Sequence, residues 1–159
     1  MIVLDGQPAL SAFRIDRLNS ELARHAPGCL VRAARFVFFV DADDAPIDTG
    51  TLCEVIEASP DAAASAALWI VPRLGTRSPW SSKATDILRG CGFPVRRIER
   101  GIAFDLDGAP ARDSAGWHAV ARALHDPMTQ SVIDSLARID TLFDTGAPAP
   151  LERVALAGD

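Results

Sequence analysis

The sequence predicts an α+β fold, and three observations favour this class. Of the 159 residues, 48% are apolar and 23% are charged, and the mean hydropathy is +0.13, which is typical of a globular protein. Short apolar strand patterns alternate with amphipathic helix patterns along the chain. The order strand, helix, strand, helix then occurs twice, which predicts two tandem βαβα halves at about residues 1–62 and 63–145.

The first half shows each pattern clearly. Ile15, Leu18 and Leu22 form an apolar stripe at three- and four-residue spacing, which indicates a helix that Pro27 and Gly28 end. A run dense in Phe and Val indicates a strand after this helix. The predicted elements are strands at residues 2–4 and 31–40 and helices at residues 9–24 and 51–58.

The second half repeats that order. Ser78 and Pro79 are typical of a helix N-cap and a first-turn proline. Ile102, Phe104 and Leu106 alternate with other residues, which indicates a strand. The predicted elements are strands at residues 68–71 and 95–106 and helices at residues 79–91 and 117–124.

A further helix is predicted at residues 127–143, with Asp126 as its N-cap and Pro127 in its first turn. Its inner face would carry Val132, Leu136, Ile139 and Phe143. The sequence G-A-P-A-P then predicts a linker. We therefore expect one domain over residues 1–145 and the start of a linker over residues 146–159, as in the front piece of a longer protein.

Residues 72–87, P-R-L-G-T-R-S-P-W-S-S-K-A-T-D-I, join a strand to a helix through an unusually polar and cationic loop. The first N–H groups of the helix would point outward with partial positive charge, near Arg73, Arg77 and Lys83. The loop therefore predicts a site for an anion or for a carboxylate-bearing partner surface. An ordinary capped helix with a solvated lysine is the other interpretation of these residues.

Charge and cysteine content exclude several classes. The net charge of −5 argues against nonspecific binding to nucleic acid or to an anionic membrane. No apolar run approaches the ~20 residues that span a bilayer, and the N-terminus does not resemble a signal peptide. The three cysteines, Cys29, Cys53 and Cys91, form neither a disulfide framework nor a zinc pattern, and they suit a cytoplasmic protein.

Catalytic and metal-binding patterns are weak. Residues 41–48 are acidic, but an EF-hand loop counted from Asp41 would need Gly and Glu where Pro46 and Leu52 stand. The three histidines lack a metal-ligand spacing, and the chain contains no G-x-S-x-G sequence, P-loop or dinucleotide fingerprint. We therefore expect no catalytic residue, metal or cofactor in this domain.

Residues 72–87 closely resemble the signature of the N-terminal domain of the large, single-chain phosphoribosylformylglycinamidine synthase, the amidotransferase that acts on formylglycinamide ribonucleotide (FGAR). Leu74 and Arg77 fall at variable positions of that signature. Three further segments resemble the same domain in the same order, so the resemblance spans nearly the whole chain. They are G-Q-P-A-L-S-A-F-R at 6–14, I-E-R-G-I-A-F at 98–104 and L-H-D-P-M-T-Q-S-V at 124–132.

The resemblance implies two fused PurS-like halves, a pseudo-dimer with antiparallel sheets and packed helices. It also implies a part in purine biosynthesis, within a carbon–nitrogen ligase that converts FGAR, ATP and glutamine to formylglycinamidine ribonucleotide, ADP, phosphate and glutamate. ATP and Mg²⁺ would then bind in the full enzyme, outside this domain.

The family's synthetase and glutaminase domains become the expected partners, with this domain coupling them and covering the synthetase site. The expected contact or substrate-proximal residues are Arg73, Thr76, Ser78, Trp80, Ser81, Ser82 and Lys83. The alternative is a free-standing regulatory module that binds a phosphorylated metabolite at the helix start next to Ser78.

Overall fold

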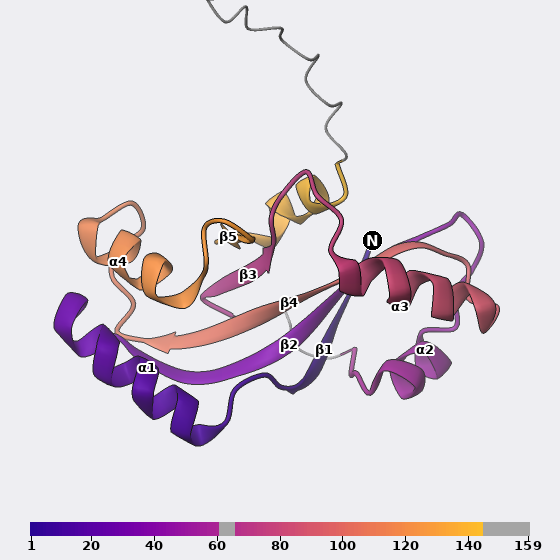
Figure 1. Ribbon diagram of the computed structural model, residues 1–159. Helices are drawn as coiled ribbons and strands as arrows, with labels where there is room; N and C mark the ends of the chain where they lie inside the picture. Colours follow the sequence, from indigo (N-terminus) through magenta and orange to yellow (C-terminus); the bar gives the residue numbers. More distant parts are fainter. Residues whose placement is uncertain (61–65, 145–159) are drawn as a thin grey trace, which may run out of the picture.

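The computed structural model describes residues 1–60 and 66–144, and it has an α+β architecture with one five-stranded antiparallel sheet (Figure 1). The strand order in the sheet is β1-β2-β4-β3-β5. The strands are β1 (Ile2–Pro8), β2 (Leu30–Ala42), β3 (Leu68–Pro72), β4 (Val95–Asp107) and β5 (Gln130–Ile133). The helices are α1 (Ala12–His25), α2 (Thr49–Ile56), α3 (Pro79–Gly90), α4 (Ala115–Leu124) and the 3₁₀ helix η2 (Leu136–Leu142).

The predicted α+β class is confirmed, and the eight elements predicted for the two halves are all present with small shifts at their ends. The strands of both halves join in a single sheet, however, rather than forming one sheet each. The long strands β2 and β4 pair from Leu30↔Asp107 to Ala42↔Val95 at its centre. The tandem relation of the halves and the domain boundary after residue 145 stay predictions, and the predicted linker lies outside the described residues.

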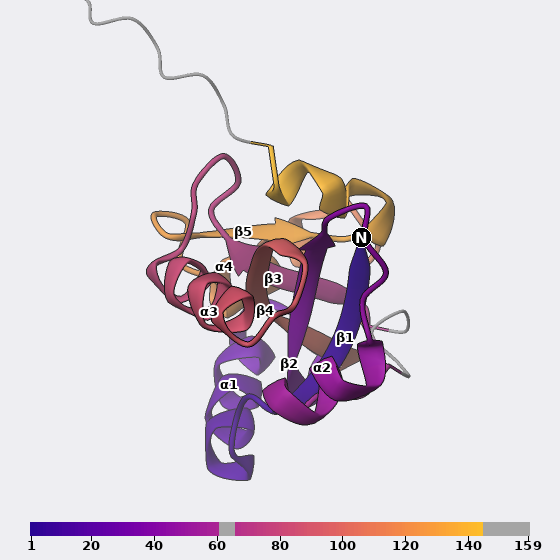
Figure 2. The ribbon, with the colours of Figure 1, turned by 90° about the vertical axis from the view of Figure 1, so that its right-hand side faces the viewer.

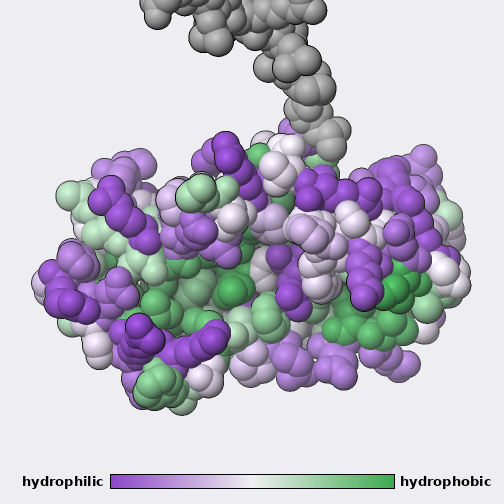
Figure 3. Space-filling model, viewed as in Figure 1, coloured by the Kyte–Doolittle hydropathy of each residue, from purple (hydrophilic) through white to green (hydrophobic). Residues whose placement is uncertain are grey.

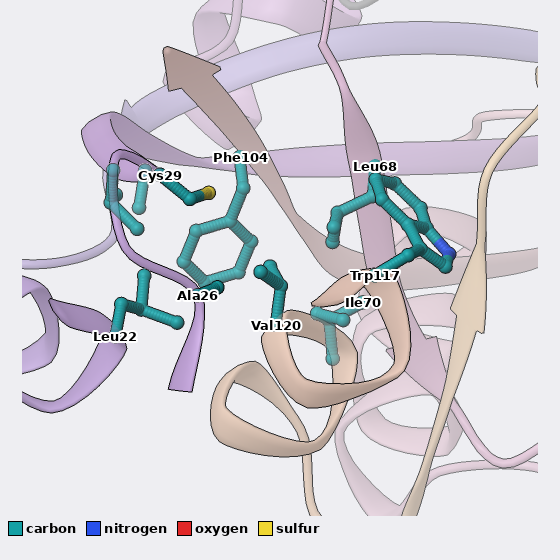
Figure 4. Close-up of a cluster of buried hydrophobic side chains, with 10 residues drawn as sticks. Leu22, Ala26, Cys29, Leu68, Ile70, Phe104, Trp117 and Val120 are labelled. Carbon is teal, nitrogen blue, oxygen red and sulfur yellow. The ribbon is translucent and has the colours of Figure 1, made fainter. Parts of the chain in front are cut away.

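One face of the sheet carries the four α-helices. At one end, α1 and α4 cover a cluster that includes Leu22, Phe104 and Val120 (Figure 4). At the other end, α2 and α3 cover a second cluster around Phe38 and Ile98. Figure 2 shows α1 and α3 together on one side of the sheet. We call this surface the helix face; between the two helix pairs it leaves part of β2 and β4 uncovered.

The opposite face is covered by η2. Phe39 and Val37, the alternate residues of β2, pack there with Ile139 and Leu142 of η2. The period-2 alternation of buried residues along β2 therefore supplies both cores. Along the part of the chain that the structure describes, no helix is long and apolar enough to cross a bilayer.

The helix predicted at residues 127–143 is wrong. The Asp126 side chain accepts hydrogen bonds from the Met128 N–H and the Thr129 hydroxyl, so it closes a turn instead of starting a helix. The chain then forms β5, in which Val132 pairs with Ile70 of β3, and only η2 follows. β5 thus pairs with the edge of β3 that would otherwise be unpaired. The local apolar spacing of this segment fits a helix as well as a strand.

Candidate functional site

The loop of interest, residues 73–78, begins where β3 leaves β4. β3 pairs with β4 only from Leu68↔Phe104 to Ile70↔Ile102. The Ile70 carbonyl oxygen comes so close to Gly101 that a Cβ there would lie 2.7 Å from it. Beyond this crossing the chain turns through Gly75, whose φ of +78° is in the left-handed region, and enters α3. The remaining edge of β4, which does not pair with β3, is therefore free to contact α3.

Polar side chains of α3 bind the edge of β4 that β3 leaves free. The Thr85 hydroxyl accepts a hydrogen bond from the Ile98 N–H at 3.2 Å. The Arg89 guanidinium donates to the carbonyl oxygens of Val95 and Arg96, both at 2.8 Å. A helix thus satisfies backbone groups that an exposed edge strand would present to water or to another chain.

Thr85→Val should lower the free energy of unfolding by about 1–2 kcal/mol, because it leaves the buried Ile98 N–H without an acceptor while keeping the side-chain shape. Urea unfolding of the chain measures this difference. Thr85→Ser, which keeps the hydroxyl, is the matched control and should retain the hydrogen bond. An unchanged Thr85→Val together with a destabilised Thr85→Ser would show that methyl packing, not the hydrogen bond, holds α3 on β4.

The predicted N-cap of α3 is confirmed, and it binds a buried carboxylate. The Ser78 hydroxyl accepts from the Ser81 N–H at 3.0 Å and donates to Glu99 Oε2 at 2.7 Å. The Ser78 N–H donates to Glu99 Oε1 at 3.2 Å. Glu99 is fully buried, so the expected anion at this helix start is a side chain of the same protein.

Arg97 completes this network. Its guanidinium donates to Glu99 Oε1 at 2.7 and 3.1 Å and to the Thr76 carbonyl oxygen at 2.6 Å. Arg97 is itself buried, and it lies over the Phe143 ring with 5.4 Å from its Cζ to the ring centroid. Arg97 and Glu99 are not among the residues predicted from the sequence to form the site. Their signal was two opposite charges, two residues apart and therefore on the same face of a predicted strand.

The structure divides the seven predicted contact residues into three groups. Ser81 is fully buried, so its hydroxyl does not reach a partner surface in this conformation. Ser78 and Trp80 are half-buried, and Ser78 is occupied with Glu99. Four residues are exposed and able to contact a partner: Arg73, Thr76, Ser82 and Lys83.

Trp80 belongs to an aromatic cluster around a cation. Its ring lies 5.9 Å from the Phe38 ring, measured between centroids. The Arg100 Cζ lies 4.9 Å from the Trp80 centroid and 4.5 Å from the Phe36 centroid. Burial lowers the pKa of the Arg100 guanidinium. Sequence spacing alone does not single out Arg100, because its ring partners come from β2 and α3.

Arg100 lines a groove of about 260 Å³ on the helix face, which we call the Arg100 groove. Its floor is apolar, with Phe36, Ile70 and Ile102. Ser78, Thr129 and Gln130 add polar groups. Figure 3 shows a hollow of hydrophobic surface between the α1–α4 end and α3, bordered by hydrophilic residues.

Three of the four segments that carry the family resemblance meet at this groove. Segments 72–87, 98–104 and 124–132 each contribute lining residues. Segment 6–14 begins with Gly6, where a Cβ would lie 2.7 Å from the Phe38 ring and 3.1 Å from the Phe36 Cβ. The segments are far apart in the sequence, so their convergence is a property of the fold.

Comparison with known proteins gives a match to one family model. The family described as formylglycinamide ribonucleotide amidotransferase N-terminal matches residues 35–143. This range is well over half of the chain, and it includes every residue that lines the Arg100 groove.

Proposed function

Because the chain belongs to the family of formylglycinamide ribonucleotide amidotransferase N-terminal domains, we propose that it is the docking and coupling domain of that enzyme. The amidotransferase acts in purine biosynthesis in the cytoplasm. In this proposal the domain holds the synthetase and glutaminase domains in register and covers part of the synthetase site. The carbon–nitrogen ligase chemistry then belongs to those domains.

The convergence of three of the four resembling segments at the Arg100 groove carries this proposal. Segments that share a surface, yet lie far apart in the sequence, support a common contact. The four exposed candidate contact residues, Arg73, Thr76, Ser82 and Lys83, are polar or cationic, and Lys83 is the sole lysine of the chain. Such a surface suits reversible protein contact better than bond-making chemistry.

ATP and Mg²⁺ are not assigned to this domain. Within the described residues, no three His, Cys, Asp or Glu side chains gather where they could hold a metal ion. The residues that line the Arg100 groove include no carboxylate that could bind the Mg²⁺ of a nucleotide. The alternative, a phosphorylated metabolite at the start of α3, has no supporting observation, since Glu99 already accepts from the Ser78 N–H.

The domain would contribute by positioning and by excluding water. The Glu99–Arg97 network ties residues 76 and 78 to β4, so the loop is held in one shape before it meets its partner. A preorganised loop loses less conformational entropy on docking. Ammonia released by a glutaminase would then reach the synthetase site behind a closed protein surface.

Lys83→Ala in the full enzyme should lower glutamine-dependent turnover about fivefold or more, as for an interface residue whose truncation costs over 1 kcal/mol. Lys83 is exposed, so the domain should stay folded. Trp80→Ala should also lower turnover, with some loss of stability because the ring contacts Phe38. Arg24→Ala, an exposed cation on α1, is the matched control. Unchanged steady-state rates in both α3 variants, Lys83→Ala and Trp80→Ala, would contradict the assignment.

Complementation in trans tests the proposal as a whole. The amidotransferase without its N-terminal domain is mixed with this chain, and glutamine-dependent product formation is measured. Restored activity would support a coupling domain that docks by surface recognition. No restoration, with the chain shown to be folded, would contradict docking as a separate domain.

A further inference from the structure

Arg100 is a partly desolvated cation, and the described residues supply no counter-charge to it. Its Cζ lies over the rings of Phe36 and Trp80. Among residues 1–60 and 66–144, no acidic side chain lies within ion-pair distance of it, and no acceptor takes a hydrogen bond from it. Ring contacts satisfy the charge in part but give the N–H donors of the guanidinium no acceptor.

The surroundings of Arg100 favour an anion. The groove has one cation and no carboxylate in its lining. Gln130 Oε1 accepts from the Asp126 N–H at 2.9 Å, which leaves the Gln130 amide NH₂ as a second donor. An oxyanion in the groove could therefore bind two donor groups over an apolar floor.

We propose that the Arg100 groove receives the carboxylate of an Asp or Glu side chain from the synthetase part of the enzyme. This inference rests on the proposed function and names the chemistry of the docking contact. The guanidinium fork would bind both carboxylate oxygens, and the acid's methylene groups would pack on Phe36 and Ile102. The Trp80 and Phe36 rings hold the guanidinium at the groove before docking.

A protein carboxylate fits better than a phosphate group. A phosphate monoester carries a charge of about −1.5 to −2 near pH 7, whereas the groove offers one positive charge. The nearby start of α3 adds little, because the Glu99 carboxylate faces the Ser78 N–H. A carboxylate carries a single charge and matches one arginine.

The test measures the affinity of this chain for the amidotransferase that lacks its N-terminal domain. Arg100→Gln should raise the Kd about thirtyfold or more, as expected for a truncated, desolvated charge pair. Arg100→Lys keeps the charge and the stem but loses the fork, so its Kd should rise by a smaller factor. Arg32→Gln, an exposed arginine on β2 whose side chain is 69% exposed, is the control and should leave the Kd unchanged.

Separate results would overturn the inference and the proposed function. If the wild-type chain binds and both Arg100 variants have the same Kd as the wild type, the carboxylate contact is wrong but docking stands. If the wild-type chain does not bind, docking as a separate domain is wrong, and Arg100→Gln is then made in the full enzyme. Unchanged glutamine-dependent turnover in that variant overturns the carboxylate contact. A loss of turnover in Arg100→Gln that Arg32→Gln does not show supports the contact.

A third arm distinguishes the source of the anion. Inorganic phosphate and acetate are titrated into the wild-type chain while the Arg100 Nε–H signal is followed by NMR. A shift of this signal with acetate that the Nε–H signal of the exposed Arg32 does not show supports a carboxylate site at Arg100. Saturable binding of phosphate that also blocks docking would make the groove a phosphate site and overturn the proposal.

Discussion

Glu99→Gln is expected to lower the free energy of unfolding by about 3–5 kcal/mol, the range for breaking a buried ion pair from one side. The substitution keeps the shape of the side chain but removes the charge that balances Arg97. Arg97 would stay buried, with only 8% of its side chain exposed. The new amide would also place N–H donors against the donors of Ser78 and Arg97. Chemical denaturation of the chain measures the loss.

The neighbouring arginine provides a control at the same strand. Arg96 pairs with Asp41 at 2.8 Å, but its side chain is 50% exposed, so Arg96→Gln should change the free energy of unfolding little. Arg97→Met combined with Glu99→Leu removes both charges and should recover part of the loss. Equal losses for Glu99→Gln and Arg96→Gln would contradict a desolvated pair at the start of α3.

Gly101→Ala is the second large effect, with an expected loss of about 2–3 kcal/mol in the free energy of unfolding. A Cβ at this position would lie 2.7 Å from the Ile70 carbonyl oxygen and 3.2 Å from Phe39 and Val71. The first of these contacts is with backbone, so relief requires β3 and β4 to move apart. The crossing that directs the chain into α3 would then shift.

The control for Gly101→Ala is a glycine in open space. A Cβ added at Gly90, the last residue of α3, would meet no atom within 4 Å apart from those of its own helix and chain neighbours. Gly90→Ala should therefore stabilise the protein by up to about 1 kcal/mol. Calorimetry of both variants should show thermal shifts of opposite sign. A neutral Gly101→Ala would mean that the sheet opens there at little cost.

Local patterns predicted most of the fold. The apolar stripe of Ile15, Leu18 and Leu22 and the alternation along β4 depend only on near neighbours, and both elements formed as expected. The exception is β5, where the pairing of Val132 with Ile70 joins distant segments. Its apolar residues fit a helix as well as a strand, so sequence spacing could not select the sheet edge over a helix.

The candidate site also combines local contacts, which the sequence predicted, with long-range contacts, which it did not. The capping role of Ser78 depends on a residue three positions away, and the sequence predicted it. The partners Glu99 and Arg100 depend on where β3 departs from β4, which follows from packing across the sheet. Their charges were visible in segment 98–104, but nothing local showed that one would be buried under α3 and the other left facing a groove.

The central pairing of β2 with β4 has a consequence for how the chain folds. Val40 pairs with Ile98, and Leu30 pairs with Asp107, so the longest ladder in the sheet closes only when segments from both halves meet. These contacts join residues that are far apart in the sequence, so the contact order is high. The chain loses the entropy of closing these long loops before the contacts stabilise it, which favours slow folding. A nascent chain that ends before β4 would leave the edge of β2 opposite β1 unpaired, so the first half alone lacks the central ladder of the sheet and exposes an apolar edge strand.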